Sequence, residues 1–352
     1  VMISIIIINY NTRHLLKPCL ESLMAQGEKD REIIVIDNNS TDGSCAYMRE
    51  NFPKLTIICN GENTGYSRAA NQGIKLAKGE YVMIMNADIK FEPDYIKKCL
   101  AKMREDEKIA AICGKIYRYD FENDRKTKII DTVGLFCFKN RRVIDDGQGL
   151  EDKGQFDEEK EVFGVSGACP IYRRSALEDT KIGNEYLDED FFMYKEDIDL
   201  SWRMRLFGWK CYYLPQAVAC HGRGTGVLKK FTHHEVLKNR RKLNKMQKYY
   251  SYKNQRLMQI KNEFMSGFLR DLFPIVWKEI LILIYIILRE PYLFKSWLQM
   301  ISQVPGALKK RRYIVRHRKV SSREMNRWLR GKQSKYLQYD LENTNDLESS
   351  RL

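Results

Sequence analysis

Residues 3–8 of this 352-residue chain read ISIIII, and this stretch decides the fold class. A continuous run of β-branched residues is typical of a strand that is buried on both faces of a parallel sheet. Two similar runs follow it, EIIVI at residues 32–36 and YVMIM at residues 81–85. Helix-like segments separate these runs, so strand and helix alternate over residues 1–110. This alternation predicts an open, mostly parallel α/β sheet.

The other elements expected from the sequence complete this pattern. Helices are predicted at residues 15–24, 66–77 and 93–103, and strands at residues 55–59, 109–119 and 129–138. Ser40 and Thr41 precede one more helix, because hydroxyl side chains cap helix N-termini well. A polar, charged loop is expected at residues 139–161.

Polar residues follow three of the predicted strands at the point where each strand ends, at residues 9–11, 37–39 and 86–88. In open α/β sheets, ligands bind beyond the carboxyl ends of the strands. The three clusters therefore predict one binding rim. No GxGxxG follows the first strand and no GxxxxGK[ST] is present, so neither a dinucleotide site nor a P-loop is supported.

Individual residues of this rim suit a nucleotide diphosphate with a metal ion. Asp37 can accept hydrogen bonds from a ribose or a base edge, and a turn residue or helix cap is the alternative role. Asn63-Thr64-Gly65 precede a helix that carries Arg68, and a helix start with a nearby glycine favours a bound diphosphate. Asp88 is well placed to hold Mg²⁺ or Mn²⁺ against such a diphosphate, because these cations prefer oxygen ligands.

A second acidic cluster lies in residues 191–221, which predict a helix and then a strand that ends on a histidine. Glu196, Asp197 and Asp199 would occupy the first turn of the helix, where the helix dipole favours carboxylates. Ordinary capped helices also begin in this way, so a purely structural role is the alternative. A lone histidine such as His221 is usually structural as well. The run EYLDED at residues 185–190 is expected to be a solvated acidic loop.

These motifs, in this order, resemble those of the family 2 glycosyltransferases, which have a GT-A fold. The resemblance covers residues 3–226 and is closest to bacterial rhamnosyl- and galactofuranosyltransferases of cell-surface polysaccharide assembly. The segments that carry it are SIIIINYNT (4–12), VIDNNSTDGS (35–44), NTGYSRAANQGIKLAKGEYVMIMNAD (63–88) and YKEDIDLSWRMRLFGWKCYYLPQAVACHGRGTG (194–226).

The resemblance implies an inverting, metal-dependent transfer of a sugar from a nucleotide-diphospho-sugar. Asp88 matches the last residue of the DxD-type metal motif, and His221 matches a metal-ligand histidine. Asp197 matches the catalytic base, with Glu196 expected to help shape the acceptor site beneath the loop at residues 139–161. The donor-binding residues that we expect are Asn9, Asn11, Asp37 (which matches the nucleoside-binding aspartate), Asn39, Asn63, Gly65, Arg68, Asn71, Asn86 and Asp88.

The first position of the DxD-type motif is Asn86 in this chain, so the metal site has one carboxylate fewer than usual. The same change is familiar in rhamnosyltransferase-like members, which favours dTDP-rhamnose as the donor. We therefore expect Mg²⁺ or Mn²⁺ to bind weakly to the protein alone and more tightly once the diphosphate is present.

The net charge of +15 is unevenly distributed. Residues 227–352 carry 28 lysines and arginines against 10 acidic residues, which leaves residues 1–226 nearly neutral. The run FPIVWKEILILIYIIL at residues 273–288 and the segment 292–304 predict amphipathic helices that are too short in apolar length to span a bilayer. We expect three regions: a GT-A domain at 1–226, a basic, membrane-associating helical region at 227–337, and a disordered tail at 338–352.

Three partners are expected: the nucleotide-sugar donor, a glycan or polyprenyl-diphosphate-linked acceptor, and an anionic membrane surface. The apolar helices could instead pack on the catalytic domain or form a homodimer. A nucleic-acid-binding or scaffold protein on a degenerate transferase fold is the alternative function, because a basic aromatic tail also suits RNA or DNA. The retained Asp37, Asp88, Asp197 and His221 argue against degeneration, so nucleic acid is not the expected partner.

The location expected from the sequence is cytoplasmic, at the inner face of the cell membrane. The apolar run at residues 3–8 is too short for a signal peptide. The nine cysteines are scattered and form no CxxC motif, which argues against a disulfide framework or a zinc site and favours a reducing compartment.

Overall fold

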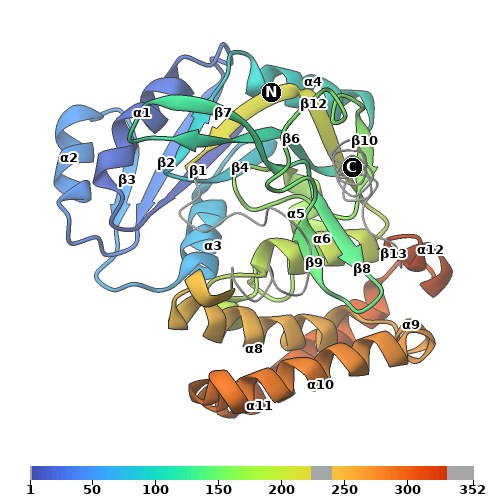
Figure 1. Ribbon diagram of the computed structural model, residues 1–352. Coiled ribbons are helices and arrows are strands. Elements are labelled where there is room, and N and C mark those ends of the chain that lie inside the picture. Colours follow the sequence, from blue (N-terminus) through green and yellow to red (C-terminus); the bar gives the residue numbers. More distant parts are fainter. Residues whose placement is uncertain (1, 223–239, 331–352) are drawn as a thin grey trace, which may run out of the picture.

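The computed structural model describes residues 2–222 and 240–330 and is built around a ten-stranded sheet with helices on both faces (Figure 1). The first elements are β1 (Ile3–Asn9), α1 (Arg13–Met24), β2 (Arg31–Asp37), α2 (Ser44–Asn51), β3 (Thr56–Cys59), α3 (Tyr66–Leu76) and β4 (Tyr81–Asn86). The four strands are parallel, in the order β3-β2-β1-β4. Every residue of β1 is buried, which explains its unbroken apolar sequence.

The second half of the sheet is mixed. Its elements are β5 (Ile89–Phe91), α4 (Tyr95–Glu105), β6 (Ile109–Asp120), β7 (Arg125–Thr132), β10 (Lys160–Val162), β11 (Ile171–Arg173), α5 (Arg174–Thr180), α6 (Glu196–Leu206) and β12 (Lys210–His221). Strand β11 lies antiparallel between β4 and β6, while β12 is parallel to β6 and antiparallel to β5. Strand β5 thereby brings the end of β12 next to the end of β4.

Two apolar layers hold the helices against the sheet. Helices α1, α2 and α4 cover one face, and α3, α5 and α6 cover the other. Each helix buries apolar side chains against the sheet. Examples are Leu16, Met48 and Leu100 on the first face and Ile74, Leu177 and Met204 on the second. The predicted α/β fold is confirmed.

The prediction of one strand at residues 129–138 was wrong. The segment forms two strands in different sheets, β7 in the main sheet and β8 (Leu135–Phe138), which pairs with β9 (Val143–Asp145) and β13 (Leu329–Arg330) in a small second sheet. The chain turns between them at Gly134, whose φ of +106° is readily adopted only by glycine. The loop expected at 139–161 therefore begins as part of this small sheet.

Cysteine pairing also differs from the expectation in part. Cys45 of α2 and Cys59 of β3 form a disulfide, with 6.3 Å between their Cα atoms. The other seven cysteines are buried and free, so no disulfide framework exists.

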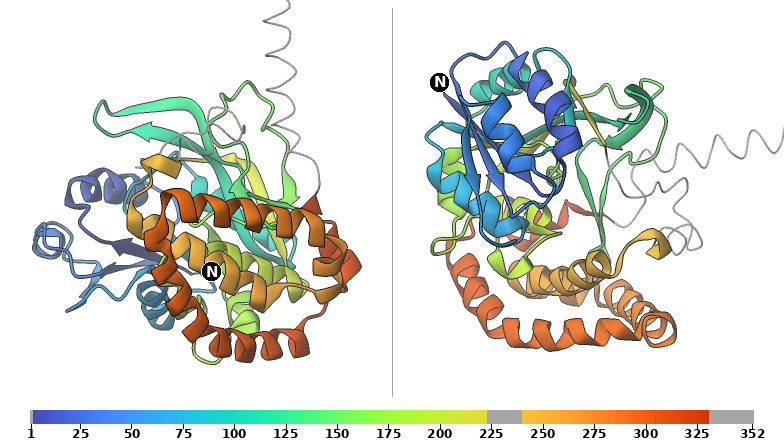
Figure 2. Two further views of the ribbon diagram at one scale, coloured as in Figure 1. Left: turned by 60° about the horizontal axis from the view of Figure 1, so that its bottom comes forward. Right: turned by 90° about the vertical axis from the view of Figure 1, so that its left-hand side faces the viewer.

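The C-terminal helices form a layer of their own below the sheet domain (Figures 1 and 2). They are α8 (Lys245–Asn262), α9 (Met265–Arg270), α10 (Leu272–Arg289), α11 (Phe294–His317) and α12 (Ser322–Asn326), with a short 3₁₀ turn at Pro291–Leu293. Helix α8 packs against α6, and α10 and α11 lie outside it. None of the helices in the described ranges is both long and apolar enough to cross a bilayer.

These helices share a hydrophobic core with the sheet domain. Trp202 and Leu206 of α6 belong to one apolar cluster with Leu257 and Met258 of α8 and Ile314 of α11. The predicted boundary after residue 226 therefore does not separate two cores. The tail predicted to be disordered, 338–352, lies outside the described residues.

The acidic run at residues 185–190 is not the solvated loop that we expected. Asp188 is buried and accepts hydrogen bonds from the ammonium groups of Lys261 in α8 and Lys310 in α11, the latter at 2.6 Å. Lys310 also binds Glu185 and Asp190. Although burial opposes ionisation, these lysines hold the pKa of Asp188 well below its usual range. The run thus anchors the C-terminal helices to the sheet domain.

Candidate active site

The first rim cluster is organised around the buried carboxylate of Asp37, at the end of β2. Its Oδ2 accepts a hydrogen bond from Asn9 Nδ2 at 2.6 Å, and its Oδ1 accepts one from the backbone N–H of Ser40 at 2.9 Å. The hydrogen bond from Ser40 means that Asp37 also fills the turn role that was its alternative function. A carboxylate has about four acceptor positions, so these two bonds leave capacity for a ligand.

The neighbouring asparagines shape the loops of this rim. Asn11 and Asn39 both have left-handed backbone conformations, with φ of +53° and +69°. Asn11 Oδ1 accepts from the backbone N–H of Thr41 at 2.8 Å, whereas Asn39 is exposed. Asn63 Oδ1 accepts from Asn38 Nδ2 at 2.9 Å and from the Gly65 N–H at 3.0 Å, which ties the turn before α3 to the end of β2.

The turn at Gly65 is fixed by a contact that the sequence did not reveal. Its φ is +83°, and a Cβ atom there would lie 2.5 Å from the Phe192 ring, so only glycine fits. Arg68 is exposed and pairs with Glu189 at 3.0 Å.

The prediction that Asn71 binds the donor was wrong. Asn71 is fully buried, its Oδ1 accepts from the backbone N–H groups of Tyr186 and Leu187, and its Nδ2 donates to the Leu187 carbonyl and to Glu189. Its amide group is therefore fully used in fixing residues 186–189 to α3.

Asp88 and His221 meet at the end of β4. Strand pairing places His221 beside Ile89 of β5, and His221 Nε2 lies 3.2 Å from Asp88 Oδ1. His221 Nδ1 lies 2.8 Å from Oδ2 of Asp131, a buried residue of β7 that the sequence analysis missed because it sits within a predicted strand. Burial disfavours the imidazolium, but the two carboxylates outweigh it and raise the pKa of His221 to about 10.

These residues fit a divalent cation in part. Asp88 and His221 converge on one point, and Asp131 orients the imidazole through its other nitrogen, as carboxylates commonly do behind metal-binding histidines. Among residues 2–222 and 240–330, no group of three or more His, Cys, Asp or Glu side chains is placed to hold a metal. Asn86, at the end of β4, adds no carboxylate. A cation here therefore needs further oxygen ligands from a diphosphate or water.

The acidic pair begins α6, as predicted, and Glu196 is buried while Asp197 is partly exposed. Asp197 Oδ2 accepts from the Gly167 N–H at 2.9 Å, and its Oδ1 accepts from the Ile198 N–H at 2.8 Å. Glu196 is buried, and its Oε2 has no hydrogen-bond partner within the described part of the chain.

This environment affects the pKa values of the two carboxyl groups differently. Burial, and then the charge of Asp197, raise the pKa of Glu196 to about 8. Burial and the charge of Asp145 also raise the pKa of Asp197. The two backbone N–H groups stabilise the negative charge on Asp197, whereas Glu196 Oε2 receives no such bond, so Glu196 is the member of the pair that favours its protonated form.

A strained segment precedes the pair, and a C-terminal helix holds it. Phe192, Tyr194 and Lys195 all have positive φ, which is unfavourable for such side chains. Asn254 of α8 donates to the backbone carbonyls of residues 191, 193 and 194 at 2.8–2.9 Å. The same helix stacks Tyr250 on Phe192, with ring centroids 5.0 Å apart. No sequence pattern singled out Asn254, because its partners are main-chain atoms.

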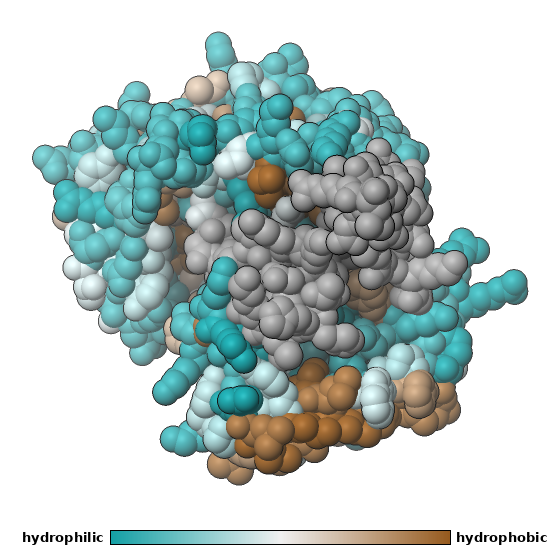
Figure 3. All heavy atoms as spheres, in the orientation of Figure 1, coloured by the Kyte–Doolittle hydropathy of each residue, from teal (hydrophilic) through white to brown (hydrophobic). Residues whose placement is uncertain are grey.

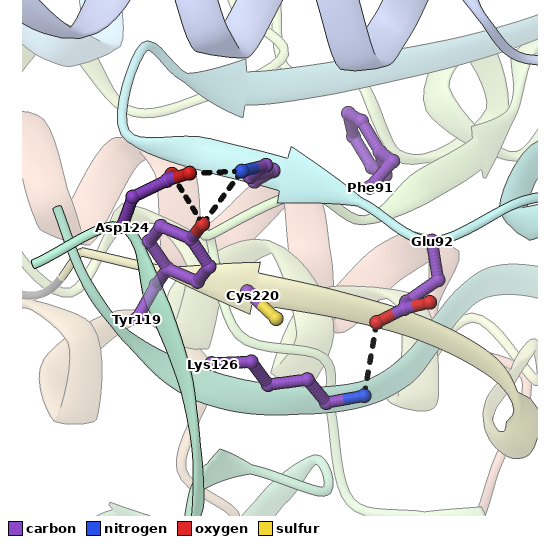
Figure 4. Close-up of a pocket in the computed structure, with 7 residues that line it drawn as sticks. Phe91, Glu92, Tyr119, Asp124, Lys126 and Cys220 are labelled. Atoms are coloured by element: carbon purple, nitrogen blue, oxygen red, sulfur yellow. Dashed lines mark hydrogen bonds and ion pairs between the residues drawn. The ribbon is translucent and has the colours of Figure 1, made fainter.

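The cavity shown in Figure 4 is not part of this site. Lys90, Asp124 and Tyr119 form one hydrogen-bonded group on its wall, and Lys126 pairs with Glu92 at 3.0 Å. It also contains Cys220, which points to the opposite face of β12 from His221.

The raised pKa of Asp197 predicts a pH dependence. If Asp197 is the base that the resemblance implies, its ionised carboxylate is the form that accepts a proton, and the acid limb of kcat/KM should lie above the ordinary aspartate pKa of about 3.9. Asp145→Asn removes a negative charge that raises this pKa. The limb should therefore move to lower pH and activity should extend further into acid. The control is Glu122→Gln, an exposed change of equal charge. A limb that stays in place or moves upward in Asp145→Asn would contradict the assignment.

Comparison with known proteins agrees with this geometry. The model of glycosyl transferase family 2 matches residues 4–181, half of the chain. The chain belongs to glycosyl transferase family 2. This confirms the resemblance to that family, but it does not single out the rhamnosyltransferases.

Two curated relatives illustrate the similarity of this family 2 glycosyltransferase. EpsH of Bacillus subtilis (strain 168), named as a glycosyltransferase, is 29% identical over 202 residues, which make up 55% of each chain. Poly-β-1,6-N-acetyl-D-glucosamine synthase of Staphylococcus aureus (strain COL) is 28% identical over 214 residues, 59% of this chain and 47% of that protein. The chain thus spans about half the length of these relatives.

A solved structure supports the fold. GalNAc-T7, crystallised with UDP, GalNAc and Mn²⁺, superimposes with a TM-score of 0.51 at 14% identity and covers 77% of this chain and 54% of that one. At this identity the similarity shows the GT-A fold alone.

Proposed function

We propose that this family 2 glycosyltransferase moves a sugar from a nucleotide-diphospho-sugar to a lipid-linked cell-surface glycan, with inversion at the anomeric carbon. The observation that carries the proposal is the pair of the buried Glu196 and the partly exposed Asp197, in which two backbone N–H groups stabilise the ionised form of Asp197. A helix start with a purely structural role does not require a buried carboxyl group beside an ionised one. The rim around Asp37 and Asp88 supplies the donor side. The relative named poly-β-1,6-N-acetyl-D-glucosamine synthase, whose product is a polysaccharide, supports a glycan acceptor.

The reaction needs one proton acceptor and one stabiliser of the leaving charge. Asp197 takes the proton from the acceptor hydroxyl as its oxygen attacks the anomeric carbon. The nucleoside diphosphate leaves from the opposite face of the sugar. Glu196, which keeps its proton, donates a hydrogen bond within the acceptor site. Asp37 binds the nucleoside, and the turn at Asn63–Gly65 lies beside the diphosphate.

Asp88 and His221 would hold the cation, Mg²⁺ or Mn²⁺. When bound, such a cation neutralises the charge that develops on the departing diphosphate. The Mn²⁺ in the GalNAc-T7 structure supports a divalent ion. dTDP-rhamnose is the donor that we favour, because Asn86 replaces the first carboxylate of the DxD-type motif.

The metal site gives a prediction with a direct readout. Mn²⁺ should bind weakly to the chain alone and at least about tenfold more tightly with a nucleoside diphosphate, since two protein ligands leave most of the shell to phosphate oxygens. Electron paramagnetic resonance of Mn²⁺ measures both affinities. Asp88→Ala and His221→Ala should weaken binding, and Asp131→Asn should weaken it less, by the 10–100-fold typical of residues behind the ligands.

Chelation provides the functional counterpart. Excess chelator should remove transfer, and added Mn²⁺ should restore it. Full transfer in excess chelator would contradict this metal site. The leaving charge would then be stabilised by arginines such as Arg68, or by Arg223, which lies outside the described residues.

The surface of the C-terminal layer supports a membrane partner. Helices α9 and α10 expose a continuous apolar surface, here called the α10 face, which Figure 3 shows as a brown band along the lower edge of the molecule. Its residues are Met265, Leu269, Leu272, Phe273, Val276, Trp277, Ile280, Leu281, Ile284, Ile287 and Leu288. Contiguous apolar surfaces of this kind mark interaction sites.

We infer that an anionic bilayer covers the α10 face. Phe273 and Trp277 are aromatic residues of the kind that sit at membrane interfaces, and 79% and 54% of their surfaces are exposed. The strongly positive charge of residues 227–352 complements anionic headgroups. This layer would hold the acceptor side of the enzyme at the inner face of the cell membrane.

Vesicle binding tests this surface. Phe273→Glu/Trp277→Glu should lower the affinity for vesicles containing phosphatidylglycerol at least about tenfold, because two interfacial aromatics are lost and two negative charges are added. Met24→Glu/Leu76→Glu, which changes two exposed apolar residues elsewhere, should have little effect. Binding should weaken with salt, since exposed charges are screened over about 10 Å at 0.1 M.

The opposite result points to a protein partner. If the chain ignores anionic vesicles at low salt and light scattering shows a dimer, the α10 face is a dimer interface. Binding to RNA or DNA that leaves donor binding absent would favour the nucleic-acid alternative.

A further inference from the structure

A basic cavity of about 410 Å³ lies between the start of α8 and the end of α10. Arg241, Lys245 and Lys248 line it from the α8 side, and Arg289 and Glu290 line it from the α10 side. Two tyrosines complete the wall, Tyr285 and Tyr292. Nothing in the proposed transfer mechanism uses these residues.

The single acid of the cavity is already neutralised. Glu290 is 4% exposed, accepts a hydrogen bond from Arg240 Nε at 2.9 Å and pairs with Lys248 Nζ at 2.9 Å. Arg241, Lys245 and Arg289 are exposed, and none of them forms an ion pair with another residue of the described ranges. The cavity therefore presents three positive charges that are available to an anion.

A polar group on the wall also lacks a partner. The hydroxyl of Tyr292 is shielded from water and has no hydrogen-bond partner among residues 2–222 and 240–330. A buried hydroxyl without a partner is costly, and a phosphate oxygen would accept its hydrogen bond. Lys245 Nζ lies 5.6 Å from the centre of the Tyr292 ring, so the ammonium group and the tyrosine belong to the same side of the cavity.

The cavity lies between the α10 face and the helix that contacts the segment before the acidic pair. Ile287 and Leu288, at the end of α10, are exposed members of the α10 face and directly precede Arg289. Lys245 begins α8, and Tyr250, five residues later, stacks on Phe192 just before the acidic pair. A phosphate bound in the cavity would thus lie at the membrane surface on the helix that supports the catalytic segment.

We propose that this cavity binds a phosphate group that is carried by a membrane lipid. The inference rests on the proposed function for its meaning, since a lipid-linked acceptor must present its sugar near Asp197. Two lipids share the required chemistry: the isoprenoid diphosphate of the acceptor and a phospholipid with a phosphomonoester headgroup. Planar guanidinium groups and a phenolic hydroxyl suit phosphate oxygens.

The test measures lipid binding directly on the full chain. Farnesyl diphosphate, a soluble isoprenoid diphosphate, is titrated into wild type and into Arg241→Ala/Lys245→Ala/Arg289→Ala, with farnesol as the phosphate-free probe. The matched control is Lys309→Ala/Arg312→Ala/Arg316→Ala, which removes the same charge from exposed positions of α11. The cavity variant should bind farnesyl diphosphate at least about tenfold more weakly, the control within about twofold, and farnesol should not discriminate.

A second arm identifies the source of the phosphate. Phosphatidylcholine vesicles with a minor fraction of phosphatidic acid replace farnesyl diphosphate. Loss of affinity in the cavity variant for farnesyl diphosphate alone assigns the acceptor diphosphate, and loss for phosphatidic acid vesicles alone assigns the phospholipid. Equal affinity of wild type and cavity variant for both probes, or an equal loss in the α11 control, would overturn the proposal.

These outcomes are separable from the proposed function. Donor binding is proposed for the rim around Asp37 and Asp88, not for the cavity. It is measured by thermal shift with nucleotide-sugars, because a ligand that binds the native state raises its stability. A chain that binds farnesyl diphosphate through the cavity but no nucleotide-sugar keeps this inference and loses the proposed function. A chain that binds a nucleotide-sugar but does not bind farnesyl diphosphate through the cavity keeps the proposed function and loses this inference.

Discussion

Asp197→Asn should lower the rate of sugar transfer by about 10²–10⁴-fold, the range expected when a general base is removed. The substitution keeps the shape of the side chain and its oxygen can still accept a hydrogen bond from Gly167, but the group can no longer take a proton. Donor affinity should stay near that of wild type, because Asp197 faces the acceptor hydroxyl. The measurement is steady-state transfer together with donor binding by thermal shift.

Glu196→Gln is the informative companion to this variant. If Glu196 keeps its proton, as its pKa of about 8 indicates, the amide replaces a neutral hydrogen-bond donor and the loss should be much smaller. An Asp197→Asn variant with more than about a tenth of wild-type activity would remove Asp197 from the role of base. A larger loss in Glu196→Gln than in Asp197→Asn would exchange the two roles.

Lys261→Met should lower the free energy of unfolding by about 3–5 kcal/mol, the usual cost of removing one partner from a buried ion pair. The Lys261 ammonium is 1% exposed and lies between Asp188 and Asp199, with 2.8 Å to the latter. Methionine fills a similar volume but removes one positive charge from between the two carboxylates, which leaves Asp188 with Lys310 and leaves Asp199 with Arg203 at 3.9 Å. Urea or thermal unfolding measures the change.

The control for this variant is Lys309→Met on α11, an exposed lysine next to Lys310, which should change stability by no more than about 0.5 kcal/mol. A cost below about 1 kcal/mol for Lys261→Met in a two-state transition would mean that this buried ion pair does not stabilise the docking of α8, which would then rest on the apolar contacts of Leu257 and Met258.

The sheet was predictable because its signal is local. The apolar runs of β1 and β4 and the second half of β2 are buried, and each run ends in the polar residues that form the rim. Asp37, Asp88 and the acidic pair of α6 could be placed for the same reason, since each follows a clear change in sequence pattern. Asp88 and His221 lie far apart in the sequence, and the antiparallel pairing of β5 with β12 brings them together.

The contacts made by the C-terminal helices could not be predicted, because they depend on residues far apart in the sequence. A run such as EYLDED has the same composition whether it is solvated or neutralised by Lys261 and Lys310. Asn254 acts on backbone carbonyls, which no side-chain pattern reports. Asn71 shows the converse error, because a polar residue near a binding rim can be spent entirely on the main chain.

The central claim is that this chain is an inverting sugar transferase whose base is Asp197. The most direct measurement incubates the full chain with Mn²⁺ and a panel of nucleotide-diphospho-sugars that includes dTDP-rhamnose, and follows release of the nucleoside diphosphate. The account predicts release from one donor, at a rate that a lipid-linked acceptor increases and Asp197→Asn lowers by about 10²–10⁴-fold, with a product of inverted anomeric configuration by NMR. A product of retained configuration, or equal release by wild type and Asp197→Asn, would contradict it.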